Sequence, residues 1–98
     1  MGLTEGTTIV NIELLRERAV LAAWGISHST FMRELKAGVC TPPVKIGCNS
    51  FWPRHEINEI LRAAISGATQ EQRKRLVLEL VEQRKAMTPP SMRETEAA

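Results

Sequence analysis

A three-residue joint between two short helical segments constrains this chain more than any other feature. The joint is Gly25-Ile26-Ser27. The helix before it is expected over Arg18 to Trp24, with Val20, Ala23 and Trp24 on one side. It ends at Gly25, because glycine readily adopts the left-handed backbone of a helix C-terminus. Ser27 is a favourable N-cap for the next helix. Two helices joined by so few residues turn sharply against each other, which is the helix-turn-helix pattern.

The second helix is expected to present two different faces. Phe31 and Leu35 lie one turn apart and predict a face towards the core. At about 100° per residue, Ser29, Arg33 and Lys36 fall on the opposite side of the helix. The sequence therefore predicts a helix that packs through its aromatic side and shows cations to solvent.

A helix break and a short hairpin follow the second helix, which Gly38 ends. The Thr41-Pro42-Pro43 segment excludes helix, because proline lacks a backbone N–H and clashes with the preceding turn. Residues 44–46 alternate as a strand, residues 47–50 are turn formers, and residues 51–52 return. A two-stranded hairpin is not stable alone, so we expect it to pack on the helices as a wing.

Two more helices complete the expected fold. Pro53 is suited to the first turn of the third helix, whose apolar stripe consists of Ile57, Ile60, Leu61 and Ala64. Thr69 and Gln72 form a capping box for the fourth helix, which is expected to run to about Ala86. The core face of this helix consists of Leu76, Val77, Leu80 and Val81. Leu78 falls outside that face.

Together these elements predict a fold that is mainly α with a small β-hairpin, a winged helix-turn-helix plus a C-terminal helix. The expected divisions are a flexible N-terminus at 1–11, the winged domain at 12–67, the C-terminal helix at 68–86 and a disordered tail at 87–98. Both tryptophans are expected to pack in the core rather than stack on bases. The core is expected to contain Trp24, Phe31, Leu35, Ile57, Ile60 and Leu61.

Basic residues concentrate in the middle of the chain. The 98 residues include 13 Lys and Arg against 11 acidic residues, a net charge of +2. Residues 27–55 alone hold four cations against one glutamate, a net charge of +3. A local excess of this kind favours a polyanion as partner, and an ordinary solvated surface is the alternative.

Other classes of function receive less support from the sequence. Cys40 and Cys48 lack the paired spacing of a zinc site with His28 or His55, so we expect free thiols, with zinc or a disulfide as alternatives. No glycine-rich phosphate loop or nucleophile motif is present, which predicts no enzyme and no cofactor. No apolar run approaches the roughly 18 residues of a membrane span, and the cytoplasm is the expected compartment.

The ordered set of these elements resembles a known family. The pieces that carry the resemblance are, in chain order, Ala22-Ala23-Trp24-Gly25-Ile26-Ser27, Ser29-Thr30, Lys36-Ala37-Gly38, Pro43-Val44-Lys45-Ile46-Gly47, Trp52-Pro53, Glu56-Ile57 and residues 62–69. They resemble the AlpA family of small phage-type regulators, which is related to the excisionases and to the DNA-binding heads of the MerR class. The resemblance covers about residues 14–86. It implies a winged helix-turn-helix, double-stranded DNA as partner, and a bacterial protein that lies at the nucleoid when bound.

The chain departs from the family pattern at two places. His28 stands where many relatives have arginine, just inside the expected recognition helix, which changes one candidate DNA contact. Cys40-Thr41 stands where many relatives have a Phe-Pro pair. The second departure removes an aromatic anchor beneath the wing.

The helix-turn-helix pattern selects a set of candidate DNA contacts. A second helix of this kind lies in the major groove, which is about 12 Å wide. Arg33 is expected to read guanine, since a guanidinium matches O6 and N7 together, and Lys36 to hold a phosphate. The full helix set is His28, Ser29, Thr30, Arg33 and Lys36. The wing set, suited to phosphate or the minor groove, is Lys45, Asn49, Ser50 and Arg54.

Three hypotheses for function follow. The first is a sequence-specific DNA-binding transcriptional regulator of a prophage or integrative mobile element, with RNA polymerase as a partner. The resemblance equally implies an excisionase, a recombination directionality factor that bends attachment-site DNA for a partner integrase. The third, from another class, is a protein-interaction adaptor that docks through the C-terminal helix. One winged unit has a small footprint on DNA, so we expect cooperative self-association with Leu78 in the contact; a stray exposed leucine is the alternative.

Overall fold

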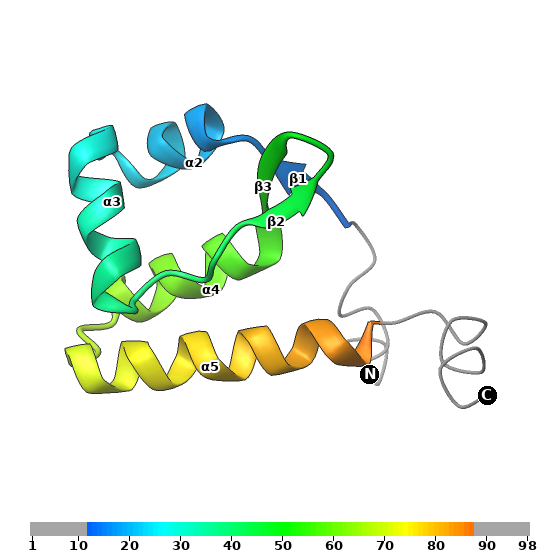
Figure 1. The fold of residues 1–98 in the computed structure, drawn as a ribbon. Coiled ribbons are helices and arrows are strands. Elements are labelled where there is room, and N and C mark those ends of the chain that lie inside the picture. Colours follow the sequence, from blue (N-terminus) through cyan, green and yellow to red (C-terminus); the bar gives the residue numbers. More distant parts are fainter. Residues whose placement is uncertain (1–11, 88–98) are drawn as a thin grey trace, which may run out of the picture.

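The computed structural model describes residues 12–87, which are mainly helical and include a small three-stranded antiparallel sheet (Figure 1). The elements are β1 (Leu14–Leu15), α2 (Glu17–Trp24), α3 (His28–Ala37), β2 (Val44–Ile46), β3 (Asn49–Pro53), α4 (Arg54–Ile65) and α5 (Gln70–Ala86). The flexible N-terminus expected at 1–11 and all but the first residue of the tail expected at 87–98 lie outside the described residues.

The joint between α2 and α3 has the expected local chemistry. Gly25 ends α2 in a left-handed conformation with a φ of 77°, and its N–H donates to the carbonyl of Leu21. The Ser27 hydroxyl caps α3 by accepting a hydrogen bond from the backbone N–H of Thr30. Gly38 ends α3 at a φ of 83°. The helix before the joint begins at Glu17, one residue earlier than the sequence predicts.

The sheet differs from the expected hairpin in two ways. Ile46 pairs with Asn49, so the turn contains only Gly47 and Cys48, and residues 49–50 belong to β3 rather than to the turn. The strand β1 also pairs with β3, with Leu15 opposite Trp52, which makes a third strand. The sequence from Asn11 to Leu15 predicts either a short strand or a turn. Two residues are too few to show the alternating pattern that would distinguish them.

The structure corrects the place of Pro53. It is the last residue of β3 and the N-cap of α4, with an extended ψ of 133°, rather than the first helical residue. Its pairing with Leu14 of β1 keeps it in the sheet. The helix therefore begins at Arg54, directly after the end of the central strand β3.

Aromatic rings in the core connect α3 with α2 and with β3. Phe31 lies edge-to-face against Trp24 and Trp52, with ring centroids 5.9 and 5.1 Å away. Trp52 is buried and donates its indole N–H to the carbonyl of Thr41, at 3.0 Å. The six residues expected in the core all belong to or pack against this cluster, so both the prediction and the core placement of the tryptophans are confirmed.

Two alanines of the expected apolar stripes are exposed. Ala23 was expected beside Val20 and Trp24, but only Val20 is buried there and Trp24 is half-buried. Ala64 was expected to extend the stripe of α4, yet it lies exposed near the end of that helix. Both placements were wrong because no described element covers these positions.

Helix α5 closes the base of the molecule beneath α4 (Figure 1). The expected capping box is present, with bonds from Gln72 N–H to the Thr69 hydroxyl and from Thr69 N–H to the Gln72 side chain. Val77 and Leu80 are buried towards α4. Leu78 is 68% exposed, as expected from its position outside the core face.

A buried ion pair joins α5 to the start of α4. Both carboxylate oxygens of Glu56, which is 0% exposed, accept hydrogen bonds of 2.7 Å from Arg84. Arg84 also donates to the carbonyl of Pro42, at 2.8 Å. One arginine thus connects α5, α4 and the loop that leads into the hairpin.

Candidate nucleic-acid interface

The predicted contacts on α3 lie mostly in solvent. His28, Ser29, Arg33 and Lys36 are exposed, and Thr30 is half-buried. Phe31 of the same helix is fully buried. The helix therefore has the buried aromatic face and the exposed polar face that the sequence predicts. The outer face of α3 is free to meet a partner along its length.

Hydrogen bonds direct Arg33 towards the first turn of α3. Its guanidinium donates to the Thr30 hydroxyl, at 3.2 Å. That hydroxyl also receives a bond from the Ser27 hydroxyl, at 3.2 Å. The guanidinium of Arg33 therefore lies towards the start of the helix, to which His28 and Ser29 also belong.

The starts of α2 and α3 are held together by a charged contact. The His28 imidazole Nδ1 contacts the carboxylate of Glu17, the first residue of α2. The contact places a carboxylate beside His28, the first of the predicted recognition residues. Its contact with His28 offsets its charge when the imidazole is protonated.

Arg16 connects the hairpin to the start of α2. Its guanidinium donates to the Asn49 side-chain oxygen at 3.2 Å and lies 5.3 Å from the centre of the Phe51 ring. Within the hairpin, the Lys45 ammonium donates to the Ser50 hydroxyl at 2.8 Å. The hairpin thus receives hydrogen bonds from Lys45 of its own strand β2 and from Arg16, directly before α2.

A hollow of about 490 Å³ lies between the start of α2 and the hairpin. It is lined by Arg16, Glu17, Arg18, Cys48, Asn49 and Ser50. Sequence reasoning missed both arginines, because residues 1–26 carry more glutamates than cations and gave no basic signal. The pairing of β1 with β3 brings them to the hairpin, and a two-residue strand offers almost no local pattern from which that pairing could be predicted.

Arg54, the last predicted wing contact, already holds a carboxylate. Its guanidinium forms two hydrogen bonds with Glu13, of 2.7 and 3.1 Å, and its backbone N–H donates to the Glu13 carbonyl. The hydrogen bond and charge of Arg54 lower the pKa of Glu13 below its ordinary value. A phosphate would have to compete with this carboxylate, so Arg54 is a weaker candidate than Lys45.

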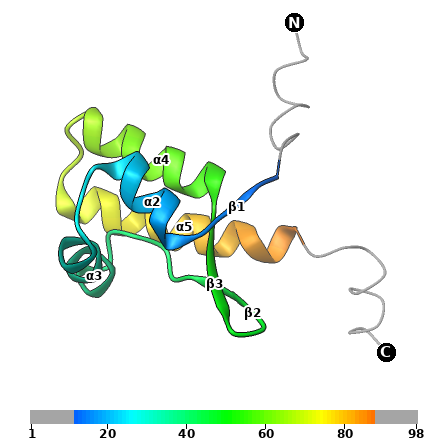
Figure 2. The ribbon, with the colours of Figure 1, turned by 90° about the horizontal axis from the view of Figure 1, so that it is seen from above.

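Most of the cations that form no ion pair among residues 12–87 belong to α3, to the hairpin or to the start of α2. Among residues 12–87, seven Lys and Arg side chains form no ion pair, and two of them, Lys74 and Arg75, belong to α5. The other five are Arg16, Arg18, Arg33, Lys36 and Lys45. Figure 2 shows that α3 and the hairpin lie on one side of the molecule, with the start of α2 between them. We call these five exposed cations, carried by the start of α2, by α3 and by the hairpin, the basic face.

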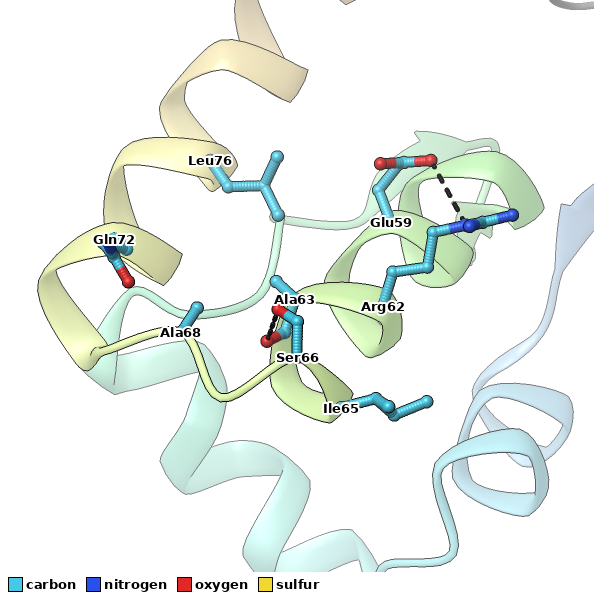
Figure 3. Close-up of a pocket in the computed structure, with 8 residues that line it drawn as sticks. All are labelled: Glu59, Arg62, Ala63, Ile65, Ser66, Ala68, Gln72 and Leu76. Atoms are coloured by element: carbon cyan, nitrogen blue, oxygen red, sulfur yellow. Dashed lines mark hydrogen bonds and ion pairs between the residues drawn. The ribbon is translucent and has the colours of Figure 1, made fainter.

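A second hollow lies away from the basic face, between the end of α4 and the start of α5 (Figure 3). It measures about 730 Å³ and includes the ion pair of Glu59 with Arg62. Ser66 is occupied by a hydrogen bond to the carbonyl of Ala63. Ile65 points away from Leu76 and is 85% exposed. None of the predicted contact residues lines this hollow.

The two cysteines lie in different environments. Cys40 is buried, and loss of solvent followed by the charges of Glu56 and Glu34 raises the pKa of its thiol to about 12. Cys48 is exposed in the hairpin turn, and both are free thiols. Within residues 12–87 no three potential metal-binding side chains of His, Cys, Asp or Glu are grouped together.

No protein-family model, curated protein or solved structure matches this chain significantly. The helices of the described residues are all too short or too polar to cross a membrane.

Proposed function

We propose that this protein is a sequence-specific DNA-binding regulator of a prophage or integrative element. In this proposal α2 and α3 form a helix-turn-helix, and the β2–β3 hairpin is its wing. The likeness to the AlpA family, which rests on the sequence pieces named above, points to the same function. The proposal is carried by one observation, the basic face.

The basic face supports DNA binding because of where its charges lie. Five cations that pair with no carboxylate of residues 12–87 are spread over the start of α2, the outer face of α3 and the hairpin. Cations left unpaired on one side of a small protein provide the electrostatic attraction that duplex DNA needs. The paired cations belong to α4 and α5, and each of them already contacts a carboxylate of the protein.

In the proposed complex α3 enters the major groove with its first turn towards the bases. Arg33 is directed to that turn by Thr30, and its guanidinium is suited to the O6 and N7 atoms of guanine. His28 and Ser29 share the same end of the helix. Lys36, one turn later, meets a phosphate and fixes the register without reading sequence.

The hairpin and the start of α2 bind the backbone beside the groove. Lys45 approaches from β2, and Arg16 and Arg18 from the hollow next to Asn49. Contacts with phosphates contribute equally to the affinity for every DNA sequence. This contribution falls as salt rises, because each contact releases condensed counterions from the DNA. We therefore assign specificity to α3 and general affinity to the other two elements.

The first test is binding of the full chain to random duplex DNA, measured by filter retention at low and high salt. The proposal predicts affinity that falls steeply as salt rises. A protein-interaction adaptor, for which the exposed face of α5 is the supporting feature, is expected to show little salt-dependent DNA affinity. That result would reject the proposal.

Footprinting on the genomic DNA around the gene then separates the two DNA-binding roles. Sites close to a promoter support a transcriptional regulator. Repeated sites inside an attachment region support instead an excisionase that works with an integrase. Both outcomes keep the basic face as the DNA contact.

A further inference from the structure

The outer face of α5 carries a regular stripe of exposed side chains. They follow one another at intervals of four and three residues, which places them on one side of the helix. In order they are Glu71, Arg75, Leu78, Glu82 and Lys85, all exposed. Leu78 lies at the centre of the stripe, with two charged residues on each side. The helix that carries them, α5, forms the base of the molecule in Figure 1.

We propose that this stripe binds a second copy of the same chain, with the two α5 helices antiparallel and crossing at Leu78. Leu78 fixes the register, because it is the only large apolar side chain of the stripe and meets its own equivalent on the two-fold axis. On its inner side it borders an apolar hollow of about 450 Å³, which includes Pro42, Pro43 and Val81. That hollow gives the leucine of the second copy an apolar surface to lie against.

The charges of the stripe agree with this register, although the register was set by the leucine alone. In the antiparallel arrangement, Arg75 of one copy lies near Glu82 of the other, and Glu71 lies near Lys85. Every pair across the two-fold axis is then of opposite charge. A parallel arrangement centred on the same leucine would place Arg75 on Arg75 and Glu82 on Glu82, which is repulsive. The charges therefore select the antiparallel orientation.

The complementarity of Arg75 and Glu82 has no use within one helix. The two residues are seven positions apart, about 10.5 Å along the axis. Within its own helix Glu82 pairs with Lys85 at 3.3 Å, and both side chains are about three-quarters exposed, so this pair contributes little. Arg75 forms no ion pair among residues 12–87. Only a second copy brings Arg75 and Glu82 together.

The contact is expected to be weak in free solution. One leucine and four exposed ion pairs cover much less than the roughly 1,200 Å² of a stable interface, so we expect a dissociation constant on the order of 1 mM. Two copies on adjacent DNA sites have an effective concentration in the same range, so the contact then becomes cooperative. The contact itself concerns the free protein and does not depend on the proposed DNA binding.

The test uses reciprocal charge reversals, measured by sedimentation equilibrium at concentrations approaching 1 mM. The unmodified chain is expected to show a mass that rises with concentration. Arg75→Glu alone and Glu82→Arg alone are each expected to weaken association about tenfold or more, because like charges then face each other twice. An equimolar mixture of the two variants restores both opposite-charge pairs between unlike copies and is expected to associate again.

Two further variants check that Leu78 is the centre of the contact. Leu78→Glu is expected to abolish association, and its exposed position leaves folding intact. Ile65→Glu changes an apolar residue that is exposed still more, at 85%, but lies on α4, and is expected to associate as the unmodified chain does. A chain that stays monomeric at every concentration, or a mixture of the charge variants that does not associate, would overturn the proposal.

Discussion

Arginines at two places in this small protein have opposite uses. On the inner side of α5, Arg84 and Arg73 are each about three-quarters buried and hold Glu56 and Glu34. On the basic face, Arg33 and the other four cations are exposed and pair with no carboxylate in the part of the chain that the structure describes. The net charge of the chain counts both groups alike, but only the second can attract an anion from outside.

The comparison indicates that pairing within the protein, more than the number of cations, decides which cations remain available to an external anion. Arg54 belongs to the basic middle of the sequence, yet its guanidinium is occupied by Glu13. Arg16 and Arg18 belong to a segment of negative net charge, yet they line the hollow beside the hairpin. Substitutions in the two groups should therefore affect different properties.

The largest effect is expected from Arg84→Ala. It leaves Glu56 buried without its partner, and breaking a buried pair on one side costs about 3–5 kcal/mol. Urea denaturation measures the change in the free energy of unfolding. Arg75→Ala on the exposed side of the same helix is the matched control, with an expected change within about 0.5 kcal/mol. Equal losses in the two variants would contradict the distinction between the groups.

Arg33→Ala should show the reverse behaviour. The side chain is exposed, so we expect the stability to change little. We expect specific DNA binding to weaken by about 1–3 kcal/mol and the preference at one base pair to relax. Competition binding with a set of single-base variants of the site measures both quantities. If this variant is folded and binds like the unmodified chain, α3 does not lie in the groove as we propose.

Lys36→Ala should have a smaller and less selective effect. Loss of one phosphate contact lowers the slope of log affinity against log salt by about one, for all sequences alike. Titrations of specific and random duplexes at several salt concentrations provide the slopes. A loss confined to the specific site would instead make Lys36 a base-reading residue.

Local signals in the sequence predicted most of the fold. Gly25, Ser27 and the Thr69 capping box each act on the backbone within a few residues, so the helix boundaries could be predicted. Two of the contacts that sequence reasoning missed show why, because they join residues far apart in the chain. Arg84 and Glu56 are separated by 28 positions, and Arg16 and Asn49 by 33. No helical or strand period relates such pairs, and only the folded chain brings them together.

The candidate site was predicted less completely than the fold. The exposed face of α3 follows from the position of Phe31, because a helix that buries one side shows the other. Which cations remain unpaired depends on distant carboxylates. Glu13 occupies Arg54 through the pairing of β1 with β3, and the sequence carried no sign of that contact.

The smallest expected effect concerns the contact between Arg54 and Glu13. Arg54 lowers the pKa of Glu13 from an ordinary value of 4.5, so the contact stabilises the fold above the unfolded pKa. This contribution is lost as pH falls through the lowered pKa of the folded state. Arg54→Gln should return the Glu13 pKa towards 4.5, as followed by NMR of the carboxyl carbon. An unchanged pKa would mean that Arg54 is free for DNA.

The most direct test of the basic face compares two triple variants that lose the same net charge. One changes three cations of the basic face, Arg18, Lys36 and Lys45, to Gln. The other changes three exposed cations outside it, Arg62, Arg75 and Lys85, to Gln. Both are titrated across a salt series with a short duplex that accommodates one copy, so that contacts between copies do not contribute.

We predict that the first variant loses about 2.7 units of the slope of log affinity against log salt, at roughly 0.9 per phosphate contact, and that the second keeps the slope of the unmodified chain. Equal losses in both variants would mean that DNA responds only to total charge and would contradict the account.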